Sequence, residues 1–107
     1  MGVMGQPNIV EITGRIDNVT SAEVETNIGL ALDGTPSALI LDFSHVTFVS
    51  SIGLRVLLMA AKRCRKQNTP LALHSVSKPI VDLFRVSGLT EFFPIHPTRE
   101  TALAAVI

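Results

Sequence analysis

The 107-residue chain contains no tryptophan, no tyrosine and a single cysteine, Cys64. It therefore has few aromatic side chains on which nucleobases could stack. Nine basic and nine acidic residues give a formal net charge of zero, whereas a nucleic-acid-binding surface requires an excess of positive charge. We expect no nucleic-acid partner. A lone thiol cannot form an intrachain disulfide, which suits a reducing compartment.

Long apolar runs are also missing. Residues 1–7 lack the apolar core of a signal peptide, and no run reaches the roughly 18 residues that a membrane span needs. Hydrophobic residues make up 47% of the chain and charged residues 17%, a balance typical of globular proteins. We expect one soluble, cytoplasmic domain at residues 8–107, preceded by a flexible tail or edge strand at residues 1–7, with no membrane partner.

Apolar residues follow strand and helix patterns in alternation. Strands are predicted at 8–16, 38–43, 71–74 and 92–96, and the nearly continuous apolar run at 38–43 is typical of a strand covered on both faces. Helices are predicted at 21–32 and 51–67, between Ser77 and Gly88, and after Thr98. This order predicts an α/β fold with a mostly parallel or mixed sheet of four to five strands.

The segment FVSSIGLRVLL, residues 48–58, places two serines where a strand gives way to a helix. At 3.6 residues per turn, Leu54, Leu57, Leu58, Ala61 and Cys64 form an apolar stripe that faces the sheet. A second, exposed face carries Ser51 at its head, followed by Arg55, Met59, Lys62 and Lys66.

Two interpretations of the serines follow from the residues. In the first, Ser50 or Ser51 is an N-cap that stabilises the helix by about 1 kcal/mol. In the second, Ser51 accepts a phosphate. A helix N-terminus tolerates that anion because its free N–H groups and dipole favour negative charge, and Arg55 lies one turn further on. Gly53 has no side chain, so a partner could approach the helix start closely.

Three segments resemble the STAS domains of the anti-sigma factor antagonist family. DFSHVTFVSSIGLRVLL, residues 42–58, is similar to the family's central signature. VEITGRID, residues 10–17, and VDLFRVSGLTEFFPI, residues 81–95, resemble a strand before it and the helix, glycine cap and strand after it. The chain differs in having Ser50 where the family often has aspartate, and Ile52 where it often has a small residue.

The resemblance implies a single STAS domain with helices mainly on one side of its sheet, which works by partner switching without a cofactor. The unphosphorylated protein would bind an anti-sigma factor that is also a serine kinase of the histidine-kinase-like ATPase fold. Phosphorylation of Ser51, or less favourably Ser50, would release it, and a PP2C-type phosphatase would restore the serine. Partner-binding residues are then expected at Asp17, Asp42, His45, Ser50, Gly53, Arg55, Met59 and Lys62.

Other interpretations stay open for single residues. Asp42 is expected to end the buried strand near Ser51, and its carboxylate could instead bond to backbone N–H groups. Asp17 could simply cap the next helix, and His45 could be an ordinary loop residue.

Alternatives also exist for the whole chain. It contains no G-x-S-x-G elbow, phosphate-binding G-x-x-x-x-G-K loop or metal-ligand spacing, so we expect neither an enzyme nor a metal site. Another possible function is that of a STAS module in a transporter or secretion-regulating complex, which binds a protein or small ligand without a sigma factor.

Overall fold

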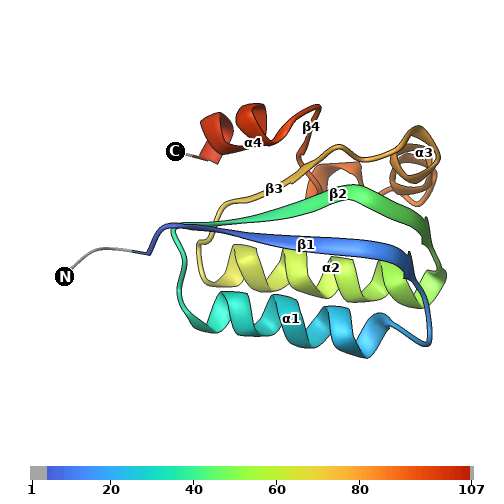
Figure 1. The fold of residues 1–107 in the computed structure, drawn as a ribbon, viewed down its shortest axis with the longest axis horizontal. Helices are drawn as coiled ribbons and strands as arrows, with labels where there is room; N and C mark the ends of the chain where they lie inside the picture. Colours follow the sequence, from blue (N-terminus) through green and yellow to red (C-terminus); the bar gives the residue numbers. More distant parts are fainter. Residues whose placement is uncertain (1–4, 107) are drawn as a thin grey trace.

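The computed structural model describes residues 5–106, in which strands and helices alternate as predicted (Figure 1). The elements are β1 (Pro7–Ile16), α1 (Ser21–Asp33), β2 (Ala38–Val49), α2 (Ser51–Lys66), β3 (Leu71–His74), α3 (Lys78–Val86), a 3-10 helix η1 (Thr90–Phe92), β4 (Ile95–His96) and α4 (Arg99–Val106). Of the predicted tail, residues 1–4 lie outside the described residues, and Pro7 already belongs to β1.

The four strands form one sheet in the order β1-β2-β3-β4, and every neighbouring pair is parallel. Parallel neighbours need a crossover between them, which α1, α2 and α3 supply in turn. The predicted α/β class with a mostly parallel sheet is therefore confirmed.

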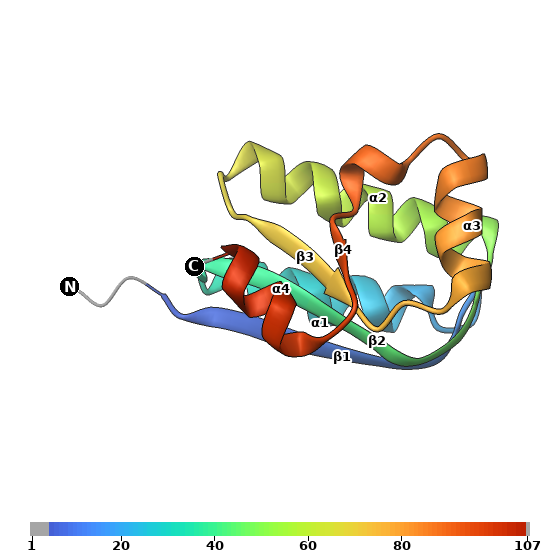
Figure 2. The same ribbon diagram turned by 90° about the horizontal axis from the view of Figure 1, so that it is seen from above.

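Helices α1 and α2 cover one face of the sheet, α4 lies on the other, and α3 stands beyond one end of the strands (Figures 1 and 2). Side chains of β2 alternate between the two layers. Leu39, Leu41 and Phe43 belong to the main core with α1 and α2, whereas Ile40 packs with Ala102 of α4. Both faces of β2 are buried, which explains the continuous apolar run in its sequence.

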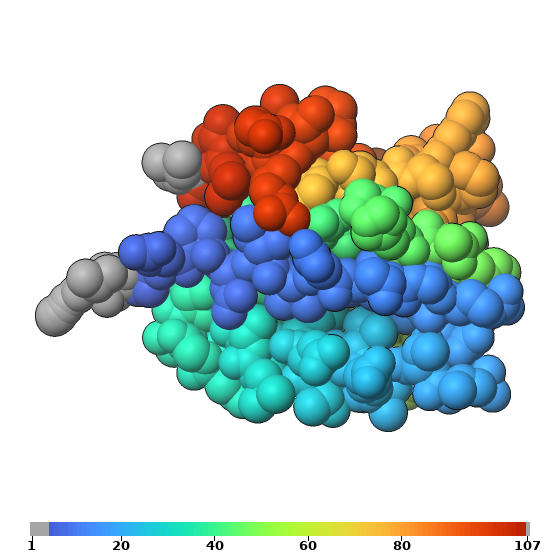
Figure 3. Space-filling model, viewed as in Figure 1, coloured from blue at the N-terminus to red at the C-terminus, as the bar shows by residue number. Residues whose placement is uncertain are grey.

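Strand β1 is an edge of the sheet, and its surface runs between α4 and α1 (Figure 3). Its last residue, Ile16, is fully buried against the start of α2. The end of β1, the end of β2 and the first turn of α2 are thus held together at one end of the molecule, and this end carries the candidate site.

Strand β2 continues to Val49, so the end predicted for this strand, at residue 43, was wrong. The pairing of β1 with β2 shifts register between Glu11 and Thr13 and again between Gly14 and Arg15. At each shift β2 carries one more residue than β1, as in a β-bulge. Extra residues break the strict alternation of polar and apolar side chains, which is why this half of the strand reads as a loop.

The glycine cap of α3 is confirmed. Gly88 has φ +72°, its N–H donates to the Arg85 carbonyl, and the Leu89 N–H donates to the Phe84 carbonyl at 2.9 Å. These are the two bonds of a Schellman motif. The following strand is shorter than predicted. Residues 90–92 form η1, and β4 begins only after Pro94, whose ring nitrogen has no hydrogen to donate to a ladder.

Candidate functional site at the junction of β2 and α2

Ser50 is the N-cap of α2. Its backbone is extended, and its Oγ accepts a hydrogen bond from the Gly53 N–H at 3.1 Å. Its own N–H donates to the Ile16 carbonyl at 2.9 Å, which joins the start of α2 to the end of β1. Of the two serines that could cap the helix, Ser50 therefore does so.

Ser51 is the first residue of α2 and is exposed. Its hydroxyl has no hydrogen-bond partner among residues 5–106, in contrast to that of Ser50. The position combines an accessible hydroxyl with a helix N-terminus, where backbone N–H groups and the helix dipole favour an added anion.

Gly53 is buried, so the expectation that a partner approaches the chain there was wrong. A Cβ built on Gly53 would collide with the Ile16 carbonyl oxygen and lie 2.9 Å from the Ile16 Cγ2. The glycine is needed because β1 of the same chain occupies that space. Gly53 fixes the position of Ser51 and does not itself offer a contact surface.

Asp17 follows β1 and organises the turn that leads into α1. Its Oδ1 accepts hydrogen bonds from the N–H groups of Val19 and Thr20, and its Oδ2 lies 3.1 Å from the Arg15 Nε. The Arg15 guanidinium, helped by the Val19 N–H, holds the pKa of the Asp17 carboxyl below its usual range. Both N–H groups lie ahead of Ser21, the first residue of α1, so the Asp17 side chain shapes the turn and does not cap the helix. The carboxylate remains partly accessible.

Thr20 and Glu23 have the sequence spacing of a capping box, but the Thr20 side chain does not cap α1. Its hydroxyl donates to the Arg15 carbonyl at 2.6 Å and accepts from the Asp17 N–H at 3.0 Å. The threonine thus tightens the same turn instead of capping the helix with its side chain.

Three exposed apolar side chains lie on the segments that meet at this end of the molecule, and the sequence patterns did not assign them to the site. Val19 is 81% exposed in the turn, Ile52 is 48% exposed beside Ser51, and Phe48 is 42% exposed near the end of β2. The Arg15 guanidinium carbon lies 4.3 Å from the centre of the Phe48 ring, a cation–π contact. Apolar residues within turn and capping positions were the available signal, because such positions are usually polar.

Asp42 does not lie near Ser51, so that expectation was wrong. Strand β2 continues for seven residues beyond it, on the order of 20 Å of extended chain. The carboxylate points to the α4 side, where Oδ2 lies 3.0 Å from an Arg99 Nη2 and Oδ1 accepts from the Ser44 N–H at 2.9 Å. The buried ring of His74 has its Nε2 3.8 Å from the same Oδ1. Asp42 therefore anchors α4 to the sheet.

We expect Asp42→Asn to lower the free energy of unfolding by about 2 kcal/mol at neutral pH, because it removes a buried charge from its partners. Burial disfavours ionisation of Asp42, but the Ser44 N–H and then Arg99 outweigh it and lower the pKa of the carboxyl. A lowered pKa stabilises the fold above the unfolded value of about 3.9, and this contribution is lost as pH falls through the folded pKa.

Urea unfolding at several pH values tests this prediction. The difference between wild type and Asp42→Asn should be constant from neutral pH to about pH 5 and shrink below about pH 4. Asp33→Asn is the matched control, because Asp33 forms an exposed ion pair with Arg63 at 2.6 Å and should cost about 0.5 kcal/mol or less. Equal losses for the two variants would contradict the anchoring role of Asp42.

The remaining predicted site residues are exposed. Arg55, Met59 and Lys62 lie on the solvent side of α2 as predicted, with Arg55 one turn after Ser51. His45 is exposed too, but it belongs to β2 and pairs in register with Thr13, six residues before Ser51. The structure therefore brings Asp17, Ser50, Ser51 and Arg55 to one end of the molecule and leaves Asp42 outside it.

A metal site and a membrane-spanning helix are both absent from the described residues. No group of three or more His, Cys, Asp or Glu side chains among residues 5–106 could hold a metal ion. In the same part of the chain, every helix is too short or too polar to cross a lipid bilayer.

Comparison with known proteins assigns this architecture. Residues 3–102 match the model of the STAS domain family. The anti-sigma-F factor antagonist RsfB of Mycobacterium tuberculosis is 31% identical over 100 residues, which cover 92% of this chain and 80% of that protein. The crystal structure of an anti-sigma factor antagonist from Mycobacterium paratuberculosis superposes with a TM-score of 0.84 at 32% identity, covering 94% of this chain and 85% of that one.

The match over nearly the whole chain defines a STAS domain protein. The chain belongs to the STAS domain family and, within it, to the anti-sigma factor antagonists. The fold alone is also shared with a sulfate transporter family protein from Wolinella succinogenes, at a TM-score of 0.79 and 24% identity, covering 94% of this chain and 84% of that one.

Proposed function

We propose that this protein antagonises an anti-sigma factor by partner switching, with Ser51 as the phosphorylated residue. The observation that carries the proposal is the contrast between the two serines. The Ser50 hydroxyl caps α2, while the Ser51 hydroxyl is exposed at the helix start. A kinase can therefore phosphorylate Ser51 without breaking the cap, and the phosphate lies where helix N–H groups favour it.

In the unphosphorylated state, the surface around Ser51 binds the anti-sigma factor, which is thereby kept from its sigma factor. The exposed apolar side chains of Val19, Phe48 and Ile52 supply contact area, and Asp17 and Arg55 supply charge. A phosphoserine adds about two negative charges and bulk near the centre of this contact, which opposes binding.

The protein is a substrate in this cycle and not a catalyst. The Ser51 hydroxyl accepts the γ-phosphoryl group of ATP in the active site of the anti-sigma factor, which is a serine kinase of the histidine-kinase-like ATPase fold. A PP2C-type phosphatase later hydrolyses the phosphoserine. These reactions take place in the cytoplasm, where the sigma factor acts.

Phosphorylation by the purified kinase with ATP, followed by mass spectrometry of the peptides, tests the proposal. We expect one phosphate on Ser51 in the wild type and none in Ser51→Ala. Ser50→Ala should still be phosphorylated, although the loss of the cap lowers stability by about 1 kcal/mol. Phosphate on Ser50 in the wild type, or full phosphorylation of Ser51→Ala, would contradict the assignment.

The fold shared with a sulfate transporter family protein leaves a transporter or secretion-regulating module as the alternative function. Such a module would bind its partner equally well whether residue 51 is serine, alanine or aspartate.

A further inference from the structure

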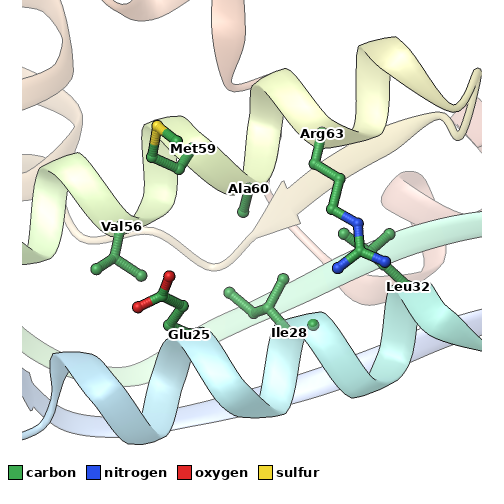
Figure 4. A pocket seen from close by; sticks show the side chains of 8 residues that line it. Glu25, Ile28, Leu32, Val56, Met59, Ala60 and Arg63 are labelled. Atoms are coloured by element: carbon green, nitrogen blue, oxygen red, sulfur yellow. The ribbon is translucent and has the colours of Figure 1, made fainter.

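An apolar groove runs between α1 and α2 on the surface that these helices turn away from the sheet (Figure 4). Its volume is about 210 Å³, and its wall is largely apolar. It is lined on the α1 side by Glu25, Ile28, Gly29 and Leu32, and on the α2 side by Val56, Met59, Ala60 and Arg63. The two charged groups, Glu25 and Arg63, lie on opposite walls. Met59 is 58% exposed at the rim, and its flexible thioether is a side chain that adapts to protein partners.

Packing within the fold does not require a glycine at position 29, and the groove is open where this glycine lies. A glycine within a helix costs about 1 kcal/mol relative to alanine. The fold does not need it, because a Cβ built there meets only the Arg63 Nη1, at the ordinary contact distance of 3.7 Å. The backbone has no positive φ at this position either. What Gly29 does provide is an unfilled wall of the groove.

The exposed face of α2 that borders the groove at Met59 is positively charged and is called the cationic rim below. Helix α2 carries five of the nine basic residues of the chain and no acidic residue. Two of the five have partners: Arg63 pairs with Asp33, and Arg65 lies over the Phe92 ring. Arg55, Lys62 and Lys66 are exposed and form no ion pair with the described residues. At 100° per residue these three lie within about 40° of one another, beside Met59.

We propose that this groove binds an amphipathic helix of the anti-sigma factor, with its apolar residues between α1 and α2 and its acidic residues against Arg55, Lys62 and Lys66. The inference rests on the function proposed above and names the chemistry of the partner's docking element. Helix-in-groove binding uses apolar side chains spaced three and four residues apart. Here the cationic rim specifies carboxylates along one side of that helix.

The same arrangement explains why a phosphate on Ser51 releases the partner. Ser51 precedes Arg55 by one turn on the same face of α2. A phosphoserine there neutralises part of the cationic rim and repels the acidic side of the bound helix. Phosphorylation thus weakens the contact along α2 as well as at its first turn.

Binding of the purified anti-sigma factor, measured by calorimetry at low and high salt, tests the inference. We expect Met59→Glu and the double variant Lys62→Glu/Lys66→Glu to weaken binding about tenfold or more. The salt dependence should be reduced in the double variant. Leu30→Glu is the matched control: Leu30 is 66% exposed on α1 and is not part of the groove wall, so its affinity should stay within about twofold.

Crosslinking identifies the docking element. Burial raises the pKa of the Cys64 thiol to about 11, so a crosslinker attached to Met59→Cys at neutral pH reacts at residue 59 alone. We expect its crosslinks to fall on a helix of the anti-sigma factor that carries several Asp or Glu. Crosslinks confined to a basic or non-helical segment would overturn the inference.

Two further outcomes separate this inference from the proposed function. If the groove variants bind like the wild type while phosphorylation of Ser51 still releases the partner, the groove is not the docking site and the switch stands. If phosphorylation has no effect on binding while the groove variants are impaired, the groove inference stands without the switch. Loss of binding to phosphatidylglycerol vesicles in the variants, with unchanged affinity for the anti-sigma factor, would assign the groove to a membrane and overturn the inference.

Discussion

Ser51→Asp is expected to lower the affinity for the anti-sigma factor by about a hundredfold or more, while Ser51→Ala binds like the unphosphorylated protein. Placing a like charge within a docked surface costs several kcal/mol, and each 1.4 kcal/mol corresponds to about a tenfold change in the dissociation constant. The readout is the dissociation constant of each purified variant for the anti-sigma factor.

Ser51→Asn is the control for shape, because asparagine matches aspartate in size without its charge. It should lose much less affinity than Ser51→Asp. All three variants should unfold within about 0.5 kcal/mol of the wild type, since the Ser51 side chain is exposed and Ser50 provides the cap. A large loss of stability in Ser51→Ala would show that Ser51 is mainly structural.

Gly53→Ala is expected to destabilise the fold by at least about 2 kcal/mol, because its Cβ collides with the Ile16 carbonyl of β1. The main chains of β1 and α2 would have to separate, which also strains the bond from the Ser50 N–H to Ile16. Chemical denaturation of the purified variant measures this loss.

Gly29→Ala provides the matched control for Gly53→Ala, since both glycines lie within helices. At position 29 the new methyl group has room, so the higher helix propensity of alanine should stabilise the protein by up to about 1 kcal/mol. Opposite signs for the two variants are the expected result. Similar stability changes would mean that the contact between Gly53 and Ile16 is not tight in solution.

The helical part of this fold was predictable from the sequence because its apolar spacing is regular. Four apolar residues recur at helical spacing in residues 21–32, and all of them are buried in α1: Val24, Ile28, Ala31 and Leu32. In α2, Leu57, Ala61 and Cys64 are buried as expected, with Leu54 and Leu58 half-buried at the edges of the stripe.

The site was less predictable because it depends on where β2 ends. Two register shifts in the pairing of β1 with β2 hide the second half of that strand. As a result Asp42 was expected near Ser51, although seven further strand residues separate it from the end of β2. A bulge cannot be predicted from the residues of one strand, because it depends on how two strands pair.

The separate roles of the residues at the start of α2 could not be predicted from the sequence either. Ser50 and Ser51 are the same residue type, and only the backbone geometry decides which hydroxyl faces the Gly53 N–H. Likewise Gly53 could have been an open contact point or a close packing position. The Ile16 carbonyl that fills its space comes from a strand 37 residues earlier, which no local pattern reveals.

The most direct test of the central claim uses the sigma factor itself. A fluorescently labelled sigma factor bound to the anti-sigma factor is titrated with this protein, either unphosphorylated or phosphorylated by the kinase, and the release of label is followed by anisotropy. The account predicts that the unphosphorylated protein displaces the sigma factor, and that phosphorylation at Ser51 shifts the required concentration upward by about a hundredfold or more. Equal displacement by both forms would contradict the assignment of Ser51 as the switch.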